Sequence, residues 1–450
     1  MTDSPAVVWF RRDLRTGDHP ALLAAAEQSR RGLALFVLDD RLLRPSGSPR
    51  VAFLYRCLRD LDEQLDGRLL VVHGDPVDVV PRIVRAVGAS SVHVSADYGP
   101  YGRERDDAVA EALDVDFVRT GSPYAVAPGR VRKGDGTPFK VFTPFSRTWA
   151  DHGWRRPADT SASTLDWIDP SEKDGGPRRV HIPDDPHVDA ELPAAGEKAA
   201  HSAWERFHDE RLADYDRDRD RPGVNGTSRM SPYLRWGCIH PRTLLADLGR
   251  GQGPQTYRTE LAWRDFYADV LWHRPDTARK NYNHRFDAMP HDSGTTATDN
   301  FDAWRRGATG YPIVDAGMRQ LLAEGWMHNR VRMIVASFLV KDLHIPWWWG
   351  ARHFMKHLVD GDLASNQHGW QWTAGSGTDA APYFRVFNPT TQGEKFDPDG
   401  QYIRRYVPEL RELTGKKVHQ PPDVPGYPAP IVDHAHERQI ALDHYNKIKS

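Results

Sequence analysis

The sequence predicts two domains of different class: an N-terminal α/β domain with a parallel sheet and an all-helical C-terminal domain. Over about the first 130 residues, short β-rich runs alternate with helical patterns, an order that favours a parallel sheet. From about residue 201 onward, the patterns are helical with periods near 3.6. A chain of 450 residues has material for two or three domains with their own cores.

In the first domain, apolar runs predict four strands, and longer amphipathic stretches predict three helices between them. The strands are Ala6–Phe10, Leu33–Leu38, Leu69–Val72 and Ser91–Val94; the helices run from the cap Asp18 to Arg30, from Arg50 to Leu65 and from Asp75 to Val87. The first strand is followed by Arg11-Arg-Asp-Leu-Arg15 and not by a Gly-x-Gly-x-x-Gly loop. A nicotinamide dinucleotide site is therefore not expected in this domain.

Composition places the domain boundaries. Residues from about Arg155 to Ala200 are rich in Pro, Asp, Gly and Ser and show little periodicity, which is typical of a connection between domains. We therefore expect an α/β domain over 1–130, a linker over 131–200 and a helical domain over 201–450. The clearest helices in the last of these are Thr243–Leu248, Thr259–His273, Ile313–Leu322 and Arg330–Leu343.

Composition also restricts where the protein works. Mean hydropathy is −0.65 and the apolar runs are far shorter than a membrane span, so we expect a protein without a membrane partner. Only Cys57 and Cys238 are present, and no secretory leader pattern opens the chain, which favours the reducing cytoplasm. The net charge of −2 argues neither for nor against nucleic acid, since phosphate contacts depend on local clusters of Lys and Arg.

Tryptophan is the most informative residue type. Ten of the fifteen tryptophans follow residue 230, and several, such as Trp263, Trp370 and Trp372, have polar neighbours in the sequence. A core tryptophan needs apolar neighbours, whereas one in a polar segment more often stacks on a planar ligand such as a flavin or a nucleobase. Tryptophan can also carry an electron. The pattern indicates a site where aromatic side chains meet a planar ligand.

One predicted helix, Thr259–His273, has a stripe of polar and aromatic residues. Glu260, Trp263, Arg264 and Tyr267 follow the i, i+3, i+4, i+7 spacing of one helix face. The stripe offers a carboxylate, a stacking ring, a guanidinium and a phenol together. Simple core packing of the two rings is the alternative, which the charged residues on the same face make weaker.

Two polar segments complete the set of candidates. Gly226-Thr-Ser-Arg-Met-Ser-Pro232 places hydroxyls and backbone N–H groups before a helix, where a phosphate can bind, although a plain N-cap is the more common reason for such residues. Asp360-Gly-Asp362 lacks the further oxygens of a calcium loop, so no metal is expected. Signatures of hydrolases and P-loop enzymes are absent from the sequence.

Together these segments resemble the DNA photolyase/cryptochrome family over nearly the whole chain. The matching motifs, in family order, are Val8-Trp-Phe-Arg-Arg-Asp-Leu-Arg15, Gly226-Thr-Ser-Arg-Met-Ser231, Glu260-Leu-Ala-Trp-Arg-Asp-Phe-Tyr267, Thr309-Gly-Tyr-Pro-Ile-Val-Asp315, Gly325-Trp-Met-His-Asn-Arg330, Asp360-Gly-Asp362 and Asn388-Pro-Thr-Thr-Gln-Gly-Glu-Lys395. The resemblance is greatest to class I cyclobutane pyrimidine dimer photolyases. It implies a Rossmann-like antenna domain, a helical FAD domain and a monomer that acts on UV-damaged DNA containing pyrimidine dimers.

The resemblance implies roles for individual residues. Asn366 would face flavin N5, where an amide does not readily donate a proton, and Trp370 and Trp347 would begin an electron relay. The FAD-binding residues would be Tyr215, Thr227, Ser228, Arg229, Met230, Ser231, Trp326, Arg332, Asp360, Gly361, Asp362 and Asn366. Contacts to the lesion or DNA would come from Glu260, Trp263, Arg264, Tyr267, Asn329, Arg330, Met333, Trp372 and Gln392.

Two features depart from the family pattern. The surface tryptophan of the relay should fall near Gly294, where the sequence has none. Either the relay ends at Trp304, Trp348 or Trp349, or light-driven reduction of the flavin is weak. The segment Tyr98–Arg105 lacks the Asn-Glu pair of folate-binding members. With Phe36, Arg50 and Asp97, it favours an 8-hydroxy-5-deazaflavin antenna over methenyltetrahydrofolate.

Three other functions remain as alternatives. A cryptochrome photosensor without repair activity is one, and Asn366 with the intact Glu260, Trp263 and Trp372 set argues against it. A (6-4) photolyase is the second, which Met333 disfavours because those enzymes need a histidine there. An ordinary flavin oxidoreductase is disfavoured because no nicotinamide motif accompanies the flavin signals.

Overall fold

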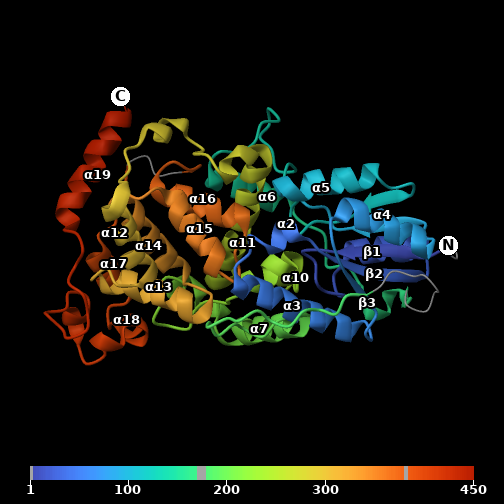
Figure 1. Cartoon of the computed structure of the whole chain (residues 1–450), viewed down its shortest axis with the longest axis horizontal. Coiled ribbons are helices and arrows are strands. Elements are labelled where there is room, and N and C mark those ends of the chain that lie inside the picture. Colours follow the sequence, from blue (N-terminus) through green and yellow to red (C-terminus); the bar gives the residue numbers. More distant parts are fainter. Residues whose placement is uncertain (1–3, 170–178, 380–383, 450) are drawn as a thin grey trace.

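The computed structural model describes residues 4–169, 179–379 and 384–449. Its first part is a parallel sheet, as the sequence predicts, with the strand order β3-β2-β1-β4-β5, in which β5 is a strand that the sequence analysis missed. The strands are β1 (Ala6–Phe10), β2 (Arg31–Leu38), β3 (Leu69–His73), β4 (Ser91–Val94) and β5 (Asp116–Arg119). Figure 1 shows this sheet at one end of an elongated molecule and the helices of the C-terminal half at the other.

Helices cover both faces of the sheet, because alternate residues of each buried strand point to opposite sides. One face packs against α4 (Pro76–Val87) and α5 (Pro100–Glu111). The other packs against α1 (Pro20–Gln28) and α3 (Ser48–Gln64). Each predicted helix is present, with its ends shifted by a few residues; the side chain of His19, rather than that of Asp18, caps α1.

The segment predicted as a linker contributes regular structure of its own. Helix α6 (Phe142–His152) packs on the helical domain, and strand β6 (Asp166–Trp167) pairs with β2. Short elements of this kind give little periodicity in the sequence, so composition alone identifies them as a connection.

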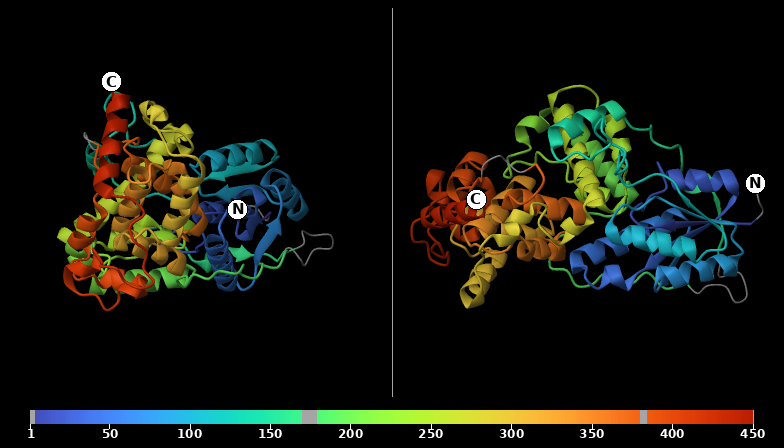
Figure 2. Two further views of the ribbon diagram at one scale, coloured as in Figure 1. Left: turned by 60° about the vertical axis from the view of Figure 1, so that its left-hand side comes forward. Right: turned by 90° about the horizontal axis from the view of Figure 1, so that it is seen from above.

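The C-terminal half is helical, as predicted, and Figure 2 shows its helices gathered beside the sheet domain. The helices that matter for the site are α9 (Ser231–Trp236), α11 (Gln252–His273), α14 (Asn329–Lys341), α15 (Trp347–His357) and α16 (Leu363–Ala374). The others are α7 (Glu197–Glu210), α8 (Tyr215–Asp218), α10 (Pro241–Asp247), α12 (Gly294–Arg306), α13 (Pro312–Glu324), α17 (Pro389–Phe396), α18 (Gln401–Tyr406) and α19 (His434–Lys449); a four-residue α2 (Asp40–Leu43) lies in the first domain.

The hydrophobic cores do not follow the domain boundary drawn from the sequence. One core joins α1 and α3 of the sheet domain to Trp204 of α7 and Phe266 of α11. A separate core holds α12 to α16 together around Trp304 and Trp370. The first helices of the C-terminal half are thus packed against the sheet domain, which fixes the position of one half relative to the other. No helix among the described residues is long and apolar enough to cross a membrane.

Candidate functional site

The polar stripe predicted on α11 is present on one half-buried face of that helix. Glu260, Trp263, Arg264 and Tyr267 are all partly exposed, while Leu261 and its apolar neighbours are buried. The Trp263 ring stacks on Phe142 of α6, with centroids 3.6 Å apart and planes 8° apart. This partner was not predicted from the sequence, because α6 lies in the predicted linker.

Glu260 has a cationic partner that the sequence analysis missed. Its Oε1 accepts a hydrogen bond from Nη1 of Arg219 at 2.6 Å. Burial raises the pKa of Glu260 and the charge of Arg219 opposes that shift, leaving the pKa above its ordinary value. The carboxyl group can therefore carry a proton more readily than an exposed glutamate and can offer an O–H donor to a bound base.

Arg264 does not point toward an exposed surface. Its guanidinium donates to the backbone carbonyls of Pro123 at 2.8 Å and Leu234 at 3.1 Å, and its side chain is 14% exposed. These bonds tie the segment after the sheet to α9 and α11. The placement gives Arg264 a structural role and does not favour the predicted DNA contact.

Asp360 and Asp362 lie near the end of the loop Gly226–Ser231, where Ser231 bonds Asp360. Oδ2 of Asp360 accepts from Oγ of Ser231 at 2.6 Å and from Nη2 of Arg332 at 2.8 Å. Its Oδ1 is buried and has no partner among the described residues. Because an unpaired buried carboxylate oxygen is costly, this atom is suited to accept an N–H from a ligand, such as the ring N–H of a flavin.

Asp362 connects this loop to the sheet domain. Its Oδ1 caps α16 by accepting from the Ser365 N–H at 3.1 Å, and its Oδ2 pairs with Nη2 of Arg12 at 2.7 Å. Burial alone would raise the pKa of Asp362, but Arg12 and Arg235 hold it well below its ordinary range. The carboxylate is therefore charged, and α16 begins at a position fixed by a residue of the other domain.

Gly361, between the two aspartates, allows close approach from α3. A Cβ at this position would lie 2.6 Å from Nη1 of Arg50, and the Gly361 carbonyl accepts from Nε of Arg235 at 2.9 Å. Arg12 and Arg235 were not predicted as site residues. Arg12 belongs to the motif Val8–Arg15, but nothing in the sequence shows that it reaches a loop 350 positions away.

The loop Gly226–Ser231 has the turn geometry of a ligand cradle. Arg229 adopts a left-handed backbone with φ 51°, and its guanidinium lies 4.3 Å from the ring centre of Trp326. The Trp326 Nε1 donates to Oγ of Ser231 at 3.3 Å, and Oγ of Ser228 bonds the Tyr257 hydroxyl at 3.0 Å. Of the other residues predicted here, Thr227 is half-buried, whereas Met230 and Tyr215 are buried in the core.

Helix α16 carries Asn366, Trp370 and Trp372 past α11. The Asn366 Nδ2 donates to the carbonyl of Ala351 at 3.1 Å, which leaves its Oδ1 available to a ligand. Trp370 is buried, and Trp372 is half-buried with its Nε1 donating to the carbonyl of Asp379. Adjacent α11 and α16 thus bring the predicted lesion-binding and flavin-binding residues together.

The tryptophans near Trp370 offer two routes toward the surface. The rings of Trp370 and Trp304 are 6.1 Å apart, and Trp304 is fully buried. Trp347 contacts Trp348, with ring centres 6.0 Å apart, and Trp348 is 36% exposed. Trp348 is thus exposed at the surface, and the choice among Trp304, Trp348 and Trp349 as the end of the relay stays a prediction.

The remaining predicted DNA contacts lie around the start of α14. Asn329 is exposed, Met333 and Gln392 are half-buried, and Arg330 pairs with Asp220 through Nη2 at 2.9 Å. The positions of these side chains do not test whether they contact DNA, so the contacts stay predictions.

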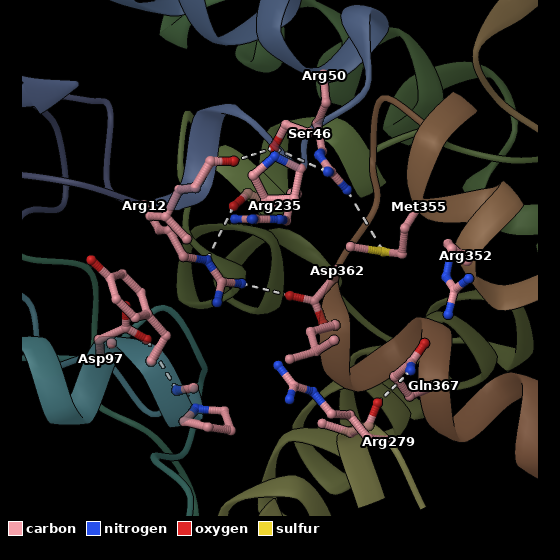
Figure 3. Close-up of a pocket in the computed structure, with 18 of the residues that line it drawn as sticks. Arg12, Ser46, Arg50, Asp97, Arg235, Arg279, Arg352, Met355, Asp362 and Gln367 are labelled. Carbon is pink, nitrogen blue, oxygen red and sulfur yellow. Dashed lines mark hydrogen bonds and ion pairs between the residues drawn. The ribbon is translucent and has the colours of Figure 1, made fainter. Parts of the chain in front are cut away.

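A large cavity of about 1390 Å³ lies between the sheet domain and the helical domain. The predicted antenna residues Phe36, Arg50 and Asp97 all line it, and Figure 3 shows Arg50 and Asp97 on different sides of it. Arg50 is 5% exposed and has no carboxylate partner at ion-pair distance among the described residues. Burial lowers the pKa of Arg50 to about 10 and that of Arg235 to about 9.

Comparison with known proteins assigns the family. The profile described as DNA photolyase matches residues 6–162, and that of the FAD binding domain of DNA photolyase matches residues 257–447. The chain therefore belongs to the DNA photolyase/cryptochrome family, as the motifs indicated. Its C-terminal half contains the FAD-binding domain of that family.

Individual relatives match over their full length. A deoxyribodipyrimidine photo-lyase of Streptomyces griseus is 40% identical, covering 97% of this chain and 98% of the relative. One from Synechococcus is 38% identical, covering 99% and 97%.

Solved structures give the same result. A bacterial class III photolyase from Agrobacterium tumefaciens matches with a TM-score of 0.91 and 36% identity, covering 100% of this chain and 98% of that one. A cryptochrome from Synechocystis matches with a TM-score of 0.89 and 28% identity, covering 98% and 100%. Because a class III photolyase matches so fully, the class I assignment stays a prediction.

Proposed function

We propose that this protein is a light-dependent lyase that splits cyclobutane pyrimidine dimers in DNA. The observation that carries the proposal is the meeting of α11 and α16, which places Glu260, Trp263 and Tyr267 beside the helix that holds Asn366 and Trp372. Relatives 38–40% identical over the full chain are named deoxyribodipyrimidine photo-lyase, which supports the same activity.

The site would hold FAD through Asp360 and through the loop that precedes α9. The buried Oδ1 of Asp360 would accept a ring N–H, and Ser228, Arg229 and Ser231 would face the phosphates and ribose. FAD, when bound and reduced, supplies the electron that weakens the cyclobutane ring. Asn366 offers an amide rather than a carboxyl group at its position, so this side chain does not readily protonate the ligand.

The lesion has to leave the base stack to reach the flavin, and a damaged pair costs less to extrude. The Trp263 ring is held in position by stacking on Phe142. Trp263 and Trp372 would provide aromatic surfaces on which the extruded bases stack. Glu260 would bond a thymine edge, with Arg219 keeping the carboxyl group in place. Asn329, Arg330 and Gln392 would contact the DNA backbone around the pocket.

The interdomain cavity is where we place an antenna chromophore. Phe36 lies in its wall, and Arg50 and Arg235 are guanidiniums without carboxylate partners at ion-pair distance in the described chain. A buried cation of this kind is stabilised by an anionic ligand. The ionised hydroxyl of 8-hydroxy-5-deazaflavin meets that requirement better than methenyltetrahydrofolate, the alternative, whose methenyl-bridged ring system carries a positive charge.

The direct test uses protein with its FAD reduced in the absence of oxygen. Thymine-dimer DNA is added, the sample is illuminated with blue or near-UV light, and recovery of base absorbance is followed against a dark control. Light-dependent recovery supports the proposal. No recovery with verified reduced flavin would overturn it in favour of a photosensor like the cryptochromes, and (6-4) lesions would then be tried. We also propose a cytoplasmic monomer, which gel filtration with light scattering would check.

A further inference from the structure

The interdomain cavity is larger than one ring system requires. Small-molecule pockets commonly enclose roughly 300–1,000 Å³, whereas this one encloses about 1390 Å³. Its two ends differ in exposure. Trp9, Phe36 and Trp236, at one end, are buried, and the other end is lined by exposed residues of α15 and of the turn after η4 (Pro275–Ala278).

The exposed end is strongly cationic. Arg279 and Lys280 follow η4, and Arg352 and Lys356 occupy one face of α15 at i, i+4 spacing. None of the four forms an ion pair with a carboxylate in the part of the chain that the structure describes. Figure 3 shows Arg352 across the cavity from Asp97, and the side chain of Arg279 extending below Asp362 toward the centre of the view.

The carboxylates that line the cavity are already engaged elsewhere. Asp362 pairs with Arg12, Asp97 lies 3.4 Å from Nη2 of Arg105, and Asp39 accepts from the Tyr101 hydroxyl. At the exposed end, Asp287 bonds Nδ2 of Asn281 at 2.8 Å and a ring nitrogen of His284 at 3.1 Å. Asp287 also attracts Lys280, but the four cations at this end outnumber the carboxylate beside them.

We infer that the exposed end of the cavity binds an anionic tail of the antenna chromophore, made of phosphate or carboxylate groups, while the buried end holds the rings. This inference rests on the proposed antenna role of the cavity. Like charges that line one end of a cavity repel one another, and an anion among them reduces that repulsion and gains charge-assisted hydrogen bonds. A chromophore that ends in a neutral chain would leave the cluster unbalanced.

The test compares chromophores that share rings and differ in their tails. FAD-containing protein without antenna is titrated with 8-hydroxy-5-deazaflavin carrying a bare ribityl chain, a phosphate-ended chain or a glutamate-extended chain. Energy transfer to the flavin and quenching of the antenna fluorescence report binding. We expect a tailed form to bind at least about tenfold more tightly than the bare form at low salt. The tail that gives the gain identifies phosphate or carboxylate as the source.

A double variant, Arg352→Gln with Lys356→Gln, should lose that gain while its affinity for the bare chromophore stays the same. The matched control changes two exposed lysines outside the cavity, Lys416→Gln with Lys417→Gln, and should keep the gain. Equal affinity for bare and tailed forms in the unchanged protein would overturn the inference, and so would a gain that survives in the double variant.

A parallel titration separates this inference from the identity of the rings. Folate with one glutamate and folate with several are compared in the same way. If folates bind with a preference for the longer tail and deazaflavins do not bind, the deazaflavin proposal fails and the tail inference stands. If no chromophore binds, both the antenna role and the tail inference fail.

Discussion

The flavin-side loop and the interdomain cavity lie next to each other but balance their charges in opposite ways. At the loop, Asp360 pairs with Arg332 and accepts a hydrogen bond from Ser231, so the protein neutralises this carboxylate itself. In the cavity, Arg50, Arg279 and Arg352 have no carboxylate at ion-pair distance among the described residues. The side chains of the loop are thus held in place before a ligand binds, whereas the cations of the cavity are neutralised only when a negatively charged ligand binds.

The largest effect is expected on the flavin side, at the buried end of the tryptophan relay. Trp370→Phe should abolish light-driven reduction of oxidised FAD, because phenylalanine is far harder to oxidise than tryptophan. Repair by chemically reduced enzyme should persist. Persistent repair would show that the variant has lost the electron relay and that its flavin and lesion site is intact. The measurement is flavin absorbance during illumination with an external donor. Unchanged photoreduction would remove Trp370 from the relay.

Asp360→Asn should weaken FAD binding by at least about tenfold, since breaking a buried ion pair costs roughly 3–5 kcal/mol. The substitution removes the charge that Arg332 and Ser231 share. Flavin content after purification and a titration of the apoprotein measure the effect. Asp299→Asn, an exposed aspartate on α12, serves as the control. Equal FAD affinity in the two variants would show that the loop does not hold the flavin.

Salt should separate the two ligands. Above about 1 M salt, where the screening length falls to about 3 Å, the antenna chromophore should dissociate while FAD remains. The physical reason is that Arg279, Lys280, Arg352 and Lys356 at the exposed end of the cavity have no ion-pair partner among the described residues, whereas the carboxylate of the Asp360–Arg332 pair is buried. Absorbance spectra after gel filtration at low and high salt check this. Retention of both chromophores, or loss of both together, would contradict the contrast drawn between the two regions.

A smaller effect should locate the outer end of the relay. Trp348→Phe should slow photoreduction several-fold, because Trp348 is exposed and contacts Trp347. Trp349→Phe, the neighbouring residue on the same helix, should change it little. Initial rates under equal illumination decide between them. The reverse order would assign the exit to the route through Trp304 and Trp349, which Phe301 joins with ring contacts of 5.7 and 5.3 Å.

The smallest effect concerns stability where α11 meets the sheet domain. Asp265 accepts hydrogen bonds from the Val126 N–H and the Trp149 Nε1, and burial raises its pKa to about 6. A raised carboxyl pKa stabilises the folded state at low pH, and that contribution is lost as the pH rises from about 4 to about 6.

Asp265→Asn keeps both acceptor bonds and removes the titration. The change in unfolding free energy between about pH 4 and pH 6 should therefore be smaller in the variant by about 2–3 kcal/mol. Urea denaturation at several pH values measures this. An unchanged slope would show that Asp265 titrates normally.

How much the sequence reveals depends on the range over which each interaction acts. The ends of β1 and β4 agree with the prediction, because buried strands are short apolar runs with clear boundaries. The stripe on α11 was also visible, since i, i+3, i+4 spacing is a property of one helix. Strand β6 and helix α6 were missed because their partners, β2 and α11, lie far away in the chain.

By itself the sequence determined the family, the order of α/β and helical domains and the chemical types present at the site. Only the tertiary structure decided which charges meet. Arg12 reaches Asp362 and Arg219 reaches Glu260 across long separations, and Arg264 donates to the backbone carbonyls of Pro123 and Leu234. The physical reason is that an ion pair depends on the distance between side chains, which periodicity and motif spacing do not contain, whereas helices and strands form from neighbours in the chain.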